Sequence, residues 1–271
     1  MTGPIGLHGG GEYDAGDEPF LDALLAAAAR VAAERHLAVP VGASLDGGEP
    51  DDPATSAAHP DEPIRIVLMP TAAGRGRPDR ATATGRAAFE RRARACRVTV
   101  SVEVARVVDA TSADDPGLIA PLVTADLIHL PGGDPDLIPA ILRDSAALAA
   151  LETAWRRGAV VAGASAGAMA LAEWTWTPAG GIHGLGFVRG IAVVPHYDDV
   201  RRLRWQQALD ELAPGGIGYL GLEEQTGVLS EPNGPDGPAW RVVGRGAAHW
   251  FPRDASAPRI GRPGEVIRLG G

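Results

Sequence analysis

Short apolar runs alternate with segments of helical periodicity along most of the chain. Each apolar run is short enough for a buried strand, and the intervening segments repeat apolar side chains at intervals of three and four residues. This alternation is typical of a mainly parallel sheet that is covered by helices on both faces. We therefore predict an α/β fold of the doubly wound type.

The predicted elements extend over the whole chain. Strands are predicted at residues 5–7, 64–69, 98–108, 126–130, 160–162, 191–194, 219–224, 228–229 and 266–269, and residues 239–250 read as a pair of strands. Helices are predicted at residues 18–35, 78–95, 135–142, 145–157 and 200–212, with a short helix directly after residue 165. Trp174 and Trp176 alternate as on a strand, where packing is their expected role. Glu12, Asp14 and Asp17 follow the first strand and are expected in a solvated loop.

Residues 42–63 break this alternation. The segment is rich in Gly, Asp, Pro, Glu and Ser, and it lacks the apolar side chains that would bury a core. No internal repeat is visible in the sequence. We interpret 42–63 as a mobile insertion between the first helix and the second strand, and we predict a single domain that spans residues 1–271.

The composition is that of an ordinary globular protein, and it narrows the range of partners. Hydrophobic residues make up 45% of the 271 residues, and the formal net charge is −9. A surface that binds nucleic acid is normally basic, so we expect no nucleic-acid partner. No apolar run approaches the length of a membrane span and no signal peptide is visible, so we expect no membrane association and a cytoplasmic location. A homodimer is an open alternative to a monomer.

Scarce residue types exclude several kinds of chemistry. Cys96 is the one cysteine, so an intrachain disulfide and a multi-thiolate metal site are excluded. All 25 lysine-or-arginine positions hold arginine. The absence of lysine rules out a Walker A lysine, a Schiff-base lysine and a Ser-Lys dyad. The histidines show no His-x₃-His spacing, so we expect neither a metal nor another cofactor.

The strongest candidate for chemistry is Ser165, in the segment Gly-Ala-Ser-Ala-Gly at 163–167. The segment joins a predicted strand to a predicted helix, where a sharp turn would project the hydroxyl away from the sheet and glycines would allow close backbone approach. The first N–H groups of the helix would lie beside a developing oxyanion. Considered without the rest of the sequence, this segment could also be an ordinary strand-to-helix turn with no catalytic role.

Two other strand ends carry residues that suit the same reaction. Pro-Gly-Gly-Asp at 131–134 offers backbone N–H groups, so Gly133 could form an oxyanion hole together with Ala166. His196 lies in Pro-His-Tyr-Asp-Asp at 195–199, directly after a predicted strand, which is where a base for Ser165 is needed. Taken alone, the glycines could form a plain turn and the histidine could be a packed structural side chain.

The order of these motifs resembles the dipeptidase E and cyanophycinase family of serine peptidases. The similarity rests on a glycine-rich first strand end and on Pro-Gly-Gly-Asp at 131–134, Gly-Ala-Ser-Ala-Gly-Ala at 163–168, Pro-His-Tyr-Asp at 195–198 and Gly-Leu-Glu-Glu-Gln-Thr at 221–226. It spans roughly residues 1–230 and implies a flavodoxin-like fold similar to class I glutamine amidotransferase domains. It also implies Ser165 as nucleophile, His196 as base, and Gly133 with Ala166 as oxyanion donors.

The third member of the triad differs between the two branches of that family. The cyanophycinase branch uses a residue whose position corresponds to Glu224, and the dipeptidase E branch uses an aspartate closer to the serine. That second position corresponds to Gly180 in this chain, so Glu224 fits better. Glu223 is the neighbouring alternative. Adjacent side chains on a strand point to opposite faces, so we expect one of the two glutamates to reach His196.

Departures from the family pattern bear on the substrate. Pro135 replaces the glutamine that cyanophycinases carry after Gly-Gly-Asp, and Asp199 replaces another glutamine after the histidine. These changes disfavour cyanophycin and leave a small acidic peptide or isopeptide as the expected substrate. Asp134, Arg201 and Arg202 are the candidate substrate-binding residues. The two arginines are chosen because a guanidinium pairs bidentately with a carboxylate. The alternative for each arginine is a solvated helix face.

Two other functions stay open. His-Gly-Gly-Gly at 8–11 matches the oxyanion motif of α/β-hydrolase esterases, in which Glu224 and His249 would complete a triad with Ser165. The position of this motif so close to the N-terminus, and so far from Ser165, disfavours that fold. The second alternative is a non-catalytic relative that binds a small ligand in the same crevice.

Overall fold

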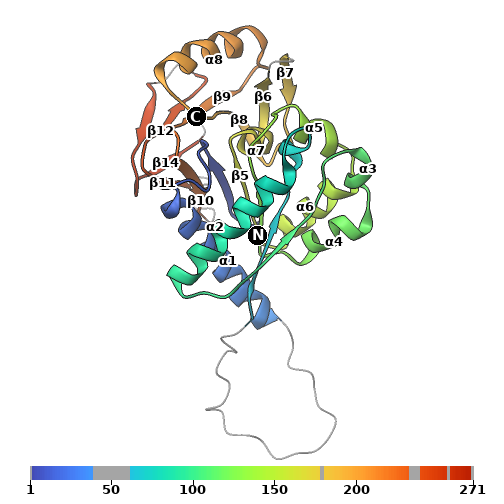
Figure 1. Ribbon diagram of the computed structural model, residues 1–271. Coiled ribbons are helices and arrows are strands. Elements are labelled where there is room, and N and C mark those ends of the chain that lie inside the picture. Colours follow the sequence, from blue (N-terminus) through green and yellow to red (C-terminus); the bar gives the residue numbers. More distant parts are fainter. Residues whose placement is uncertain (1, 39–61, 178–179, 232–238, 255–256, 270–271) are drawn as a thin grey trace, which may run out of the picture.

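The computed structural model describes residues 2–38, 62–177, 180–231, 239–254 and 257–269. Within these residues, the strands form two sheets with helices packed around them (Figure 1). Most of the predicted insertion at 42–63 lies outside the described residues, and at its end Glu62 forms an ion pair of 2.8 Å with Arg35. Among the helices described, none is long and apolar enough to cross a lipid bilayer.

The larger sheet has a parallel centre and, in the described residues, eight strands in the order β14-β11-β10-β1-β5-β4-β2-β3. The parallel strands are β1 (Ile5–His8), β2 (Ile64–Leu68), β3 (Val100–Val104), β4 (Leu127–Leu130) and β5 (Val160–Ala164). The antiparallel strands are β10 (Thr226–Ser230), β11 (Ala239–Gly244) and β14 (Val266–Arg268). Because β1, β5 and β4 are parallel neighbours, the residues that follow them meet at one end of the sheet.

Alternate side chains of the central strands face two different layers. Ile66 of β2 belongs to the apolar cluster under α1 and α2, while its neighbour Val67 belongs to the cluster on the opposite face. The helices of the first face are α1 (Glu18–Ala38) and α2 (Pro78–Cys96). Those of the second are α3 (Ala110–Ala113), α4 (Pro116–Thr124), α5 (Leu137–Leu142), α6 (Ala146–Arg156) and α7 (Ala166–Leu171). The predicted doubly wound α/β fold, with helices on both faces, is confirmed.

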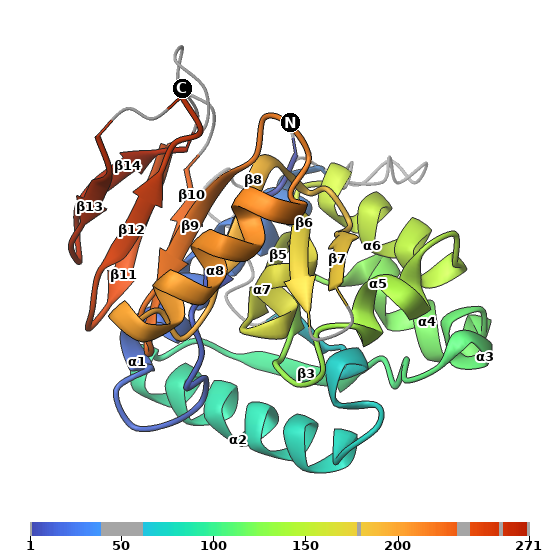
Figure 2. The ribbon, with the colours of Figure 1, turned by 90° about the horizontal axis from the view of Figure 1, so that it is seen from above.

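A second sheet packs against the same face as α7 and shares its core. In the described residues it has six strands in the order β13-β12-β9-β8-β6-β7. They are β6 (Ala172–Thr177), β7 (Gly180–His183), β8 (Val188–Val194), β9 (Gly218–Leu222), β12 (Ala248–Phe251) and β13 (Arg259–Gly261). One face contributes Val193 and Leu220 to the shared core. The other is covered by α8 (Asp199–Leu212) through Trp205 and Leu209 (Figure 2).

Two details of the fold differ from the sequence prediction. Residues 239–250 hold two strands, as predicted, but these strands do not pair with each other: β11 pairs with β10 and β14, whereas β12 pairs with β9 and β13. Gly244, the last residue of β11, has φ +127°, and a Cβ atom on it would stand 2.2 Å from the Gln225 carbonyl oxygen, so glycine allows the chain to turn there toward the other sheet. Helices α3 and α4 were not predicted, although Asp109 and Asp115 cap them.

The single-domain organisation of the whole chain stays a prediction.

Candidate active site

Ser165 lies in a sharp turn between β5 and α7. Its φ of 49° and ψ of −113° fall in a region that residues other than glycine rarely occupy. Two glycines make the turn possible. A Cβ atom on Gly163 would lie 2.4 Å from the carbonyl carbon of Gly167, and one on Gly167 would lie 2.1 Å from the carbonyl oxygen of Leu130. The Ser165 N–H also donates to the His8 carbonyl oxygen at 2.9 Å, which ties the turn to β1.

We expect Gly167→Ala to destabilise the fold, because the added methyl group would collide with the Leu130 carbonyl oxygen and force β4 and α7 apart. Overpacking of this kind costs about 1–3 kcal/mol of unfolding free energy. Thermal unfolding followed by circular dichroism measures the effect. Gly215→Ala is the matched control, since its new Cβ atom would lie 3.5 Å from the nearest atom, on the Arg253 side chain. Equal melting temperatures for the two variants would contradict the close contact at Gly167.

Hydrogen-bonding contacts join Ser165 to His196 and His196 to Glu224. Ser165 Oγ lies 3.0 Å from His196 Nε2, and His196 Nδ1 lies 2.9 Å from Glu224 Oε1. His196 follows β8 and Glu224 follows β9, so the second sheet supplies both side chains. The His196 side chain is 32% exposed and that of Glu224 is 62% exposed, so water reaches this pair. The order hydroxyl, imidazole, carboxylate is that of the triad in serine hydrolases.

The loop after β1 connects the two sheets at this site. The His196 N–H donates to the Gly9 carbonyl oxygen at 2.7 Å, and the Gln225 N–H donates to the Gly10 carbonyl oxygen at 2.8 Å. The imidazole of His196 lies against Gly10, where a Cβ atom would stand 2.1 Å from Cε1. Gly10 also has φ +119°, so both conformation and space require glycine there. The loop therefore fixes the position of His196 and of the turn that holds Glu224 relative to the larger sheet.

The two backbone groups predicted as oxyanion donors are available. Among the described residues, neither the Gly133 N–H nor the Ala166 N–H has a hydrogen-bond acceptor. A Cβ atom on Gly132 would lie 3.1 Å from Ser165 Cβ, so the turn after β4 approaches the nucleophile closely. The Gly132 N–H itself donates to Glu12 Oε1 at 2.7 Å. Gly133 and Ala166 therefore keep N–H groups without an acceptor among the described residues, as an oxyanion hole requires.

Buried polar contacts anchor the loop that carries Glu12, so the prediction that Asp17 is solvated is wrong. Asp17 Oδ1 lies 2.9 Å from His8 Nε2, although not in hydrogen-bond alignment, and Oδ2 accepts the Tyr13 N–H at 2.9 Å. The Tyr13 hydroxyl lies 2.8 Å from His129 Nδ1. Burial, and then the nearby His8, lower the pKa of His129 to about 3. Burial raises the pKa of Tyr13 well above its usual value, so this pair stays neutral near pH 7.

Glu223 and Glu224 contact different histidines, as expected for adjacent side chains, although both lie in the turn after β9. Glu223 Oε1 lies 2.8 Å from His249 Nε2. His249 is therefore paired away from Ser165, and the loop at 8–11 is hydrogen-bonded to the second sheet. Neither arrangement supports the esterase alternative, which needs His249 as the base and the loop as the oxyanion hole.

The residues predicted to bind substrate lie in different places. Asp134 lines a cavity beside the turn after β4, and its Oδ2 pairs with Arg75 at 3.1 Å. Arg202 lies on α8 with its Nε buried, and no described contact brings it to Ser165. The side chain of Arg201 lies outside the described residues. Of these three residues, Asp134 is the one that lines a cavity next to Ser165.

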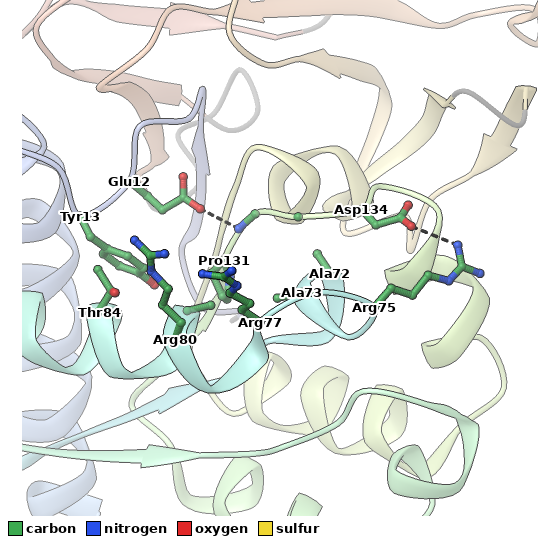
Figure 3. A pocket seen from close by; sticks show the side chains of 14 residues that line it. Glu12, Tyr13, Ala72, Ala73, Arg75, Arg77, Arg80, Thr84, Pro131 and Asp134 are labelled. Atoms are coloured by element: carbon green, nitrogen blue, oxygen red, sulfur yellow. Dashed lines mark hydrogen bonds and ion pairs between the residues drawn. The ribbon is translucent and has the colours of Figure 1, made fainter.

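The cavity beside this turn has a volume of about 580 Å³. Its walls come from the loop after β1, from the short 3₁₀ helix η2 (Thr71–Ala73) and the start of α2, and from the residues after β4 (Figure 3). Arg75, Arg77 and Arg80 line it. Sequence reasoning missed these arginines, because nothing in the local sequence separates them from solvated residues at the start of a helix.

Known proteins share both the sequence pattern and the fold. The sequence model of peptidase family S51 matches residues 55–232, which is more than half of the 271 residues. Among solved structures, a peptidase from an acI-B1 actinobacterium has a TM-score of 0.72 at 24% identity, over 99% of this chain and 98% of that one. A peptidase E protein from Listeria monocytogenes EGD-e has a TM-score of 0.47 at 13% identity, over 97% of this chain and 99% of that one. No curated protein sequence matches.

The structural likeness shows the fold of the chain, whereas the sequence match shows its family. The actinobacterial structure shares the fold over nearly the full length of both chains. The family match includes the segments that hold Ser165, His196 and Glu224, and it confirms the resemblance to dipeptidase E that the order of motifs indicated. The chain belongs to peptidase family S51 and is a serine peptidase.

Proposed function

We propose that this peptidase hydrolyses an amide bond of a small peptide through an acyl-enzyme on Ser165. The observation that carries the proposal is the pair of contacts from Ser165 Oγ to His196 Nε2 at 3.0 Å and from His196 Nδ1 to Glu224 Oε1 at 2.9 Å. The positive φ of Ser165 supports it, because backbone strain is commonly stored where a side chain must be held in a reactive orientation.

In the acylation step, Ser165 Oγ attacks the carbonyl carbon while His196 Nε2 takes the hydroxyl proton. The carbonyl oxygen becomes an oxyanion, which the N–H groups of Gly133 and Ala166 stabilise. When the C–N bond breaks, His196 returns the proton to the leaving amine. In the second step His196 takes a proton from water, the hydroxide attacks the acyl carbon, and the proton passes to Ser165 Oγ as the acid product leaves.

Glu224 acts through His196. Its carboxylate accepts the Nδ1–H, so that Nε2 is the unprotonated nitrogen that acts as base. Solvent screens this carboxylate, which is 62% exposed. We expect Glu224→Gln to lower kcat by roughly 10- to 100-fold with little change in KM, since the amide oxygen keeps the hydrogen bond and loses the charge. Glu223→Gln is the matched control, with an expected change of a few-fold. Steady-state kinetics that show the larger loss for Glu223→Gln would contradict this assignment.

We propose a small acidic peptide or isopeptide as the substrate. The cavity beside Ser165 is lined by three arginines and by two carboxylates, Glu12 and Asp134, and this excess of positive charge supports a ligand of negative charge. The test incubates purified protein with α-aspartyl, β-aspartyl and neutral dipeptides that share a second residue, and follows the released amino acids by mass spectrometry. We expect faster cleavage of an acidic series, and none by Ser165→Ala. Faster cleavage of the neutral series would contradict the proposed substrate class.

A further inference from the structure

In the part of the chain that the structure describes, two arginines of the cavity beside Ser165 have no partner of opposite charge. Among the described residues, neither Arg77 nor Arg80 takes part in an ion pair or a side-chain hydrogen bond. The other charged side chains of the cavity are engaged. Arg75 pairs with Asp134 at 3.1 Å, and Glu12 Oε1 accepts a backbone N–H from the turn after β4 at 2.7 Å. The cavity therefore holds two guanidiniums whose charge is not balanced locally.

The two guanidiniums line a cavity that adjoins the turn beside Ser165, although Ser165 itself does not line it. Figure 3 shows the side chains of Arg77 and Arg80 extending from α2 toward Tyr13 and Pro131. Gly132, the next residue along, also lines the cavity, and a Cβ atom on it would lie 3.1 Å from Ser165 Cβ. A peptide that fills the cavity and extends past Gly132 would reach both the arginines and the Ser165 hydroxyl.

Helix stability does not explain these two arginines. Arg77 is the N-cap of α2 and Arg80 lies in its first turn, where the helix dipole disfavours a positive charge. Asp79 lies in the same turn but pairs with Arg106 at 3.1 Å, so it does not neutralise them. A negatively charged group in the cavity would balance both side chains and the end of the helix.

We infer that Arg77 and Arg80 bind a carboxylate of the peptide substrate, either on an acidic side chain or at its C-terminus. The inference rests on the proposed function, because it takes Ser165 as the reacting group. Two planar guanidiniums present several N–H donors that match the oxygens of a carboxylate. Glu12, on the wall next to the turn after β4, repels a carboxylate there. The substrate carboxylate therefore lies toward α2, and the scissile amide faces Ser165.

The carboxylate could belong to an acidic side chain or to the C-terminus of a short peptide, and three isosteric peptides separate these sources. Asp-Leu-amide carries only the side-chain carboxylate, Asn-Leu carries only the terminal one, and Asn-Leu-amide carries neither. Calorimetry with full-length Ser165→Ala protein measures the Kd of each peptide without turnover. The same measurement follows with Arg77→Gln/Arg80→Gln added. Arg86→Gln/Arg91→Gln is the matched control, because it removes two exposed charges from α2 outside the cavity.

We expect at least one carboxylate peptide to bind more tightly than Asn-Leu-amide, and the peptide that does so identifies the source. Its Kd should rise by about 10- to 100-fold in the Arg77→Gln/Arg80→Gln protein and change little in the control. Circular dichroism verifies that each variant is folded, and Arg77→Lys/Arg80→Lys should restore part of the affinity. Absence of carboxylate preference in the parent, or equal losses in the control, would overturn the inference. Because binding is measured without Ser165, these results are independent of whether the acyl-enzyme mechanism is correct.

Discussion

Replacement of Ser165 by alanine should lower kcat for peptide hydrolysis by on the order of 10⁴-fold or more, because the reaction then has no nucleophile. Substrate affinity should change little, since the side chains that line the cavity remain in place. The fold should also be kept. Alanine removes one contact between the two sheets, from Ser165 Oγ to His196 Nε2, but the backbone bonds from His196 and Gln225 to the loop after β1 remain. Steady-state kinetics and the melting temperature measure the two effects.

Residual activity in this variant has to be separated from traces of the unmodified enzyme. Expression in a host that lacks the gene, with active-site titration of the final preparation, provides that control. Peptide hydrolysis at near wild-type rate by a clean Ser165→Ala preparation would remove Ser165 from the mechanism.

The two histidines that pair with the adjacent glutamates should respond very differently to substitution. His196→Ala should lower kcat by on the order of 10⁴-fold, because Ser165 then has no proton acceptor. His249→Ala should stay within a few-fold of wild type, since Nε2 of His249 pairs with Glu223 at 2.8 Å rather than with the nucleophile. The two variants are a matched pair, because each removes an imidazole that is bonded to a glutamate in the same turn.

The reverse pattern of losses would overturn the assigned triad and favour the esterase arrangement, in which His249 is the base. Equal and mild losses would instead indicate that neither histidine takes part in proton transfer, as in a protein that only binds its ligand. Measurement of kcat and KM for both variants on one peptide distinguishes these outcomes.

The parallel centre of the larger sheet could be predicted because each strand is a short apolar run followed by a helical pattern, as in β2 and α2. The division into two sheets could not be predicted. Strands of the second sheet pair over long separations, as β9 does with β12, and their apolar spacing is the same as that of the larger sheet. The separation of β11 from β12 depends on the local turn at Gly244, which the pattern of strands does not show.

Ser165 and His196 could be proposed from the sequence because each follows a predicted strand, where open α/β sheets place their ligands. Glu224 was proposed from the resemblance to the cyanophycinase branch. Residues whose surroundings depend on distant segments were missed or misplaced. Asp17 looks like a loop carboxylate in the sequence, yet its contact with His8 buries it. Arg77 lines a cavity built from three separate parts of the chain. Arg202 stands close to His196 in the sequence, but its Nε is buried on α8.

The covalent step on Ser165 is most directly tested with a fluorophosphonate probe, which reacts with an activated serine hydroxyl. Proteolysis and mass spectrometry of the labelled protein then identify the modified residue. We predict one adduct, on Ser165, that is absent in Ser165→Ala, forms far more slowly in His196→Ala and forms at the normal rate in His249→Ala. An adduct on another residue, or an active preparation that takes up no probe, would contradict Ser165 as the nucleophile.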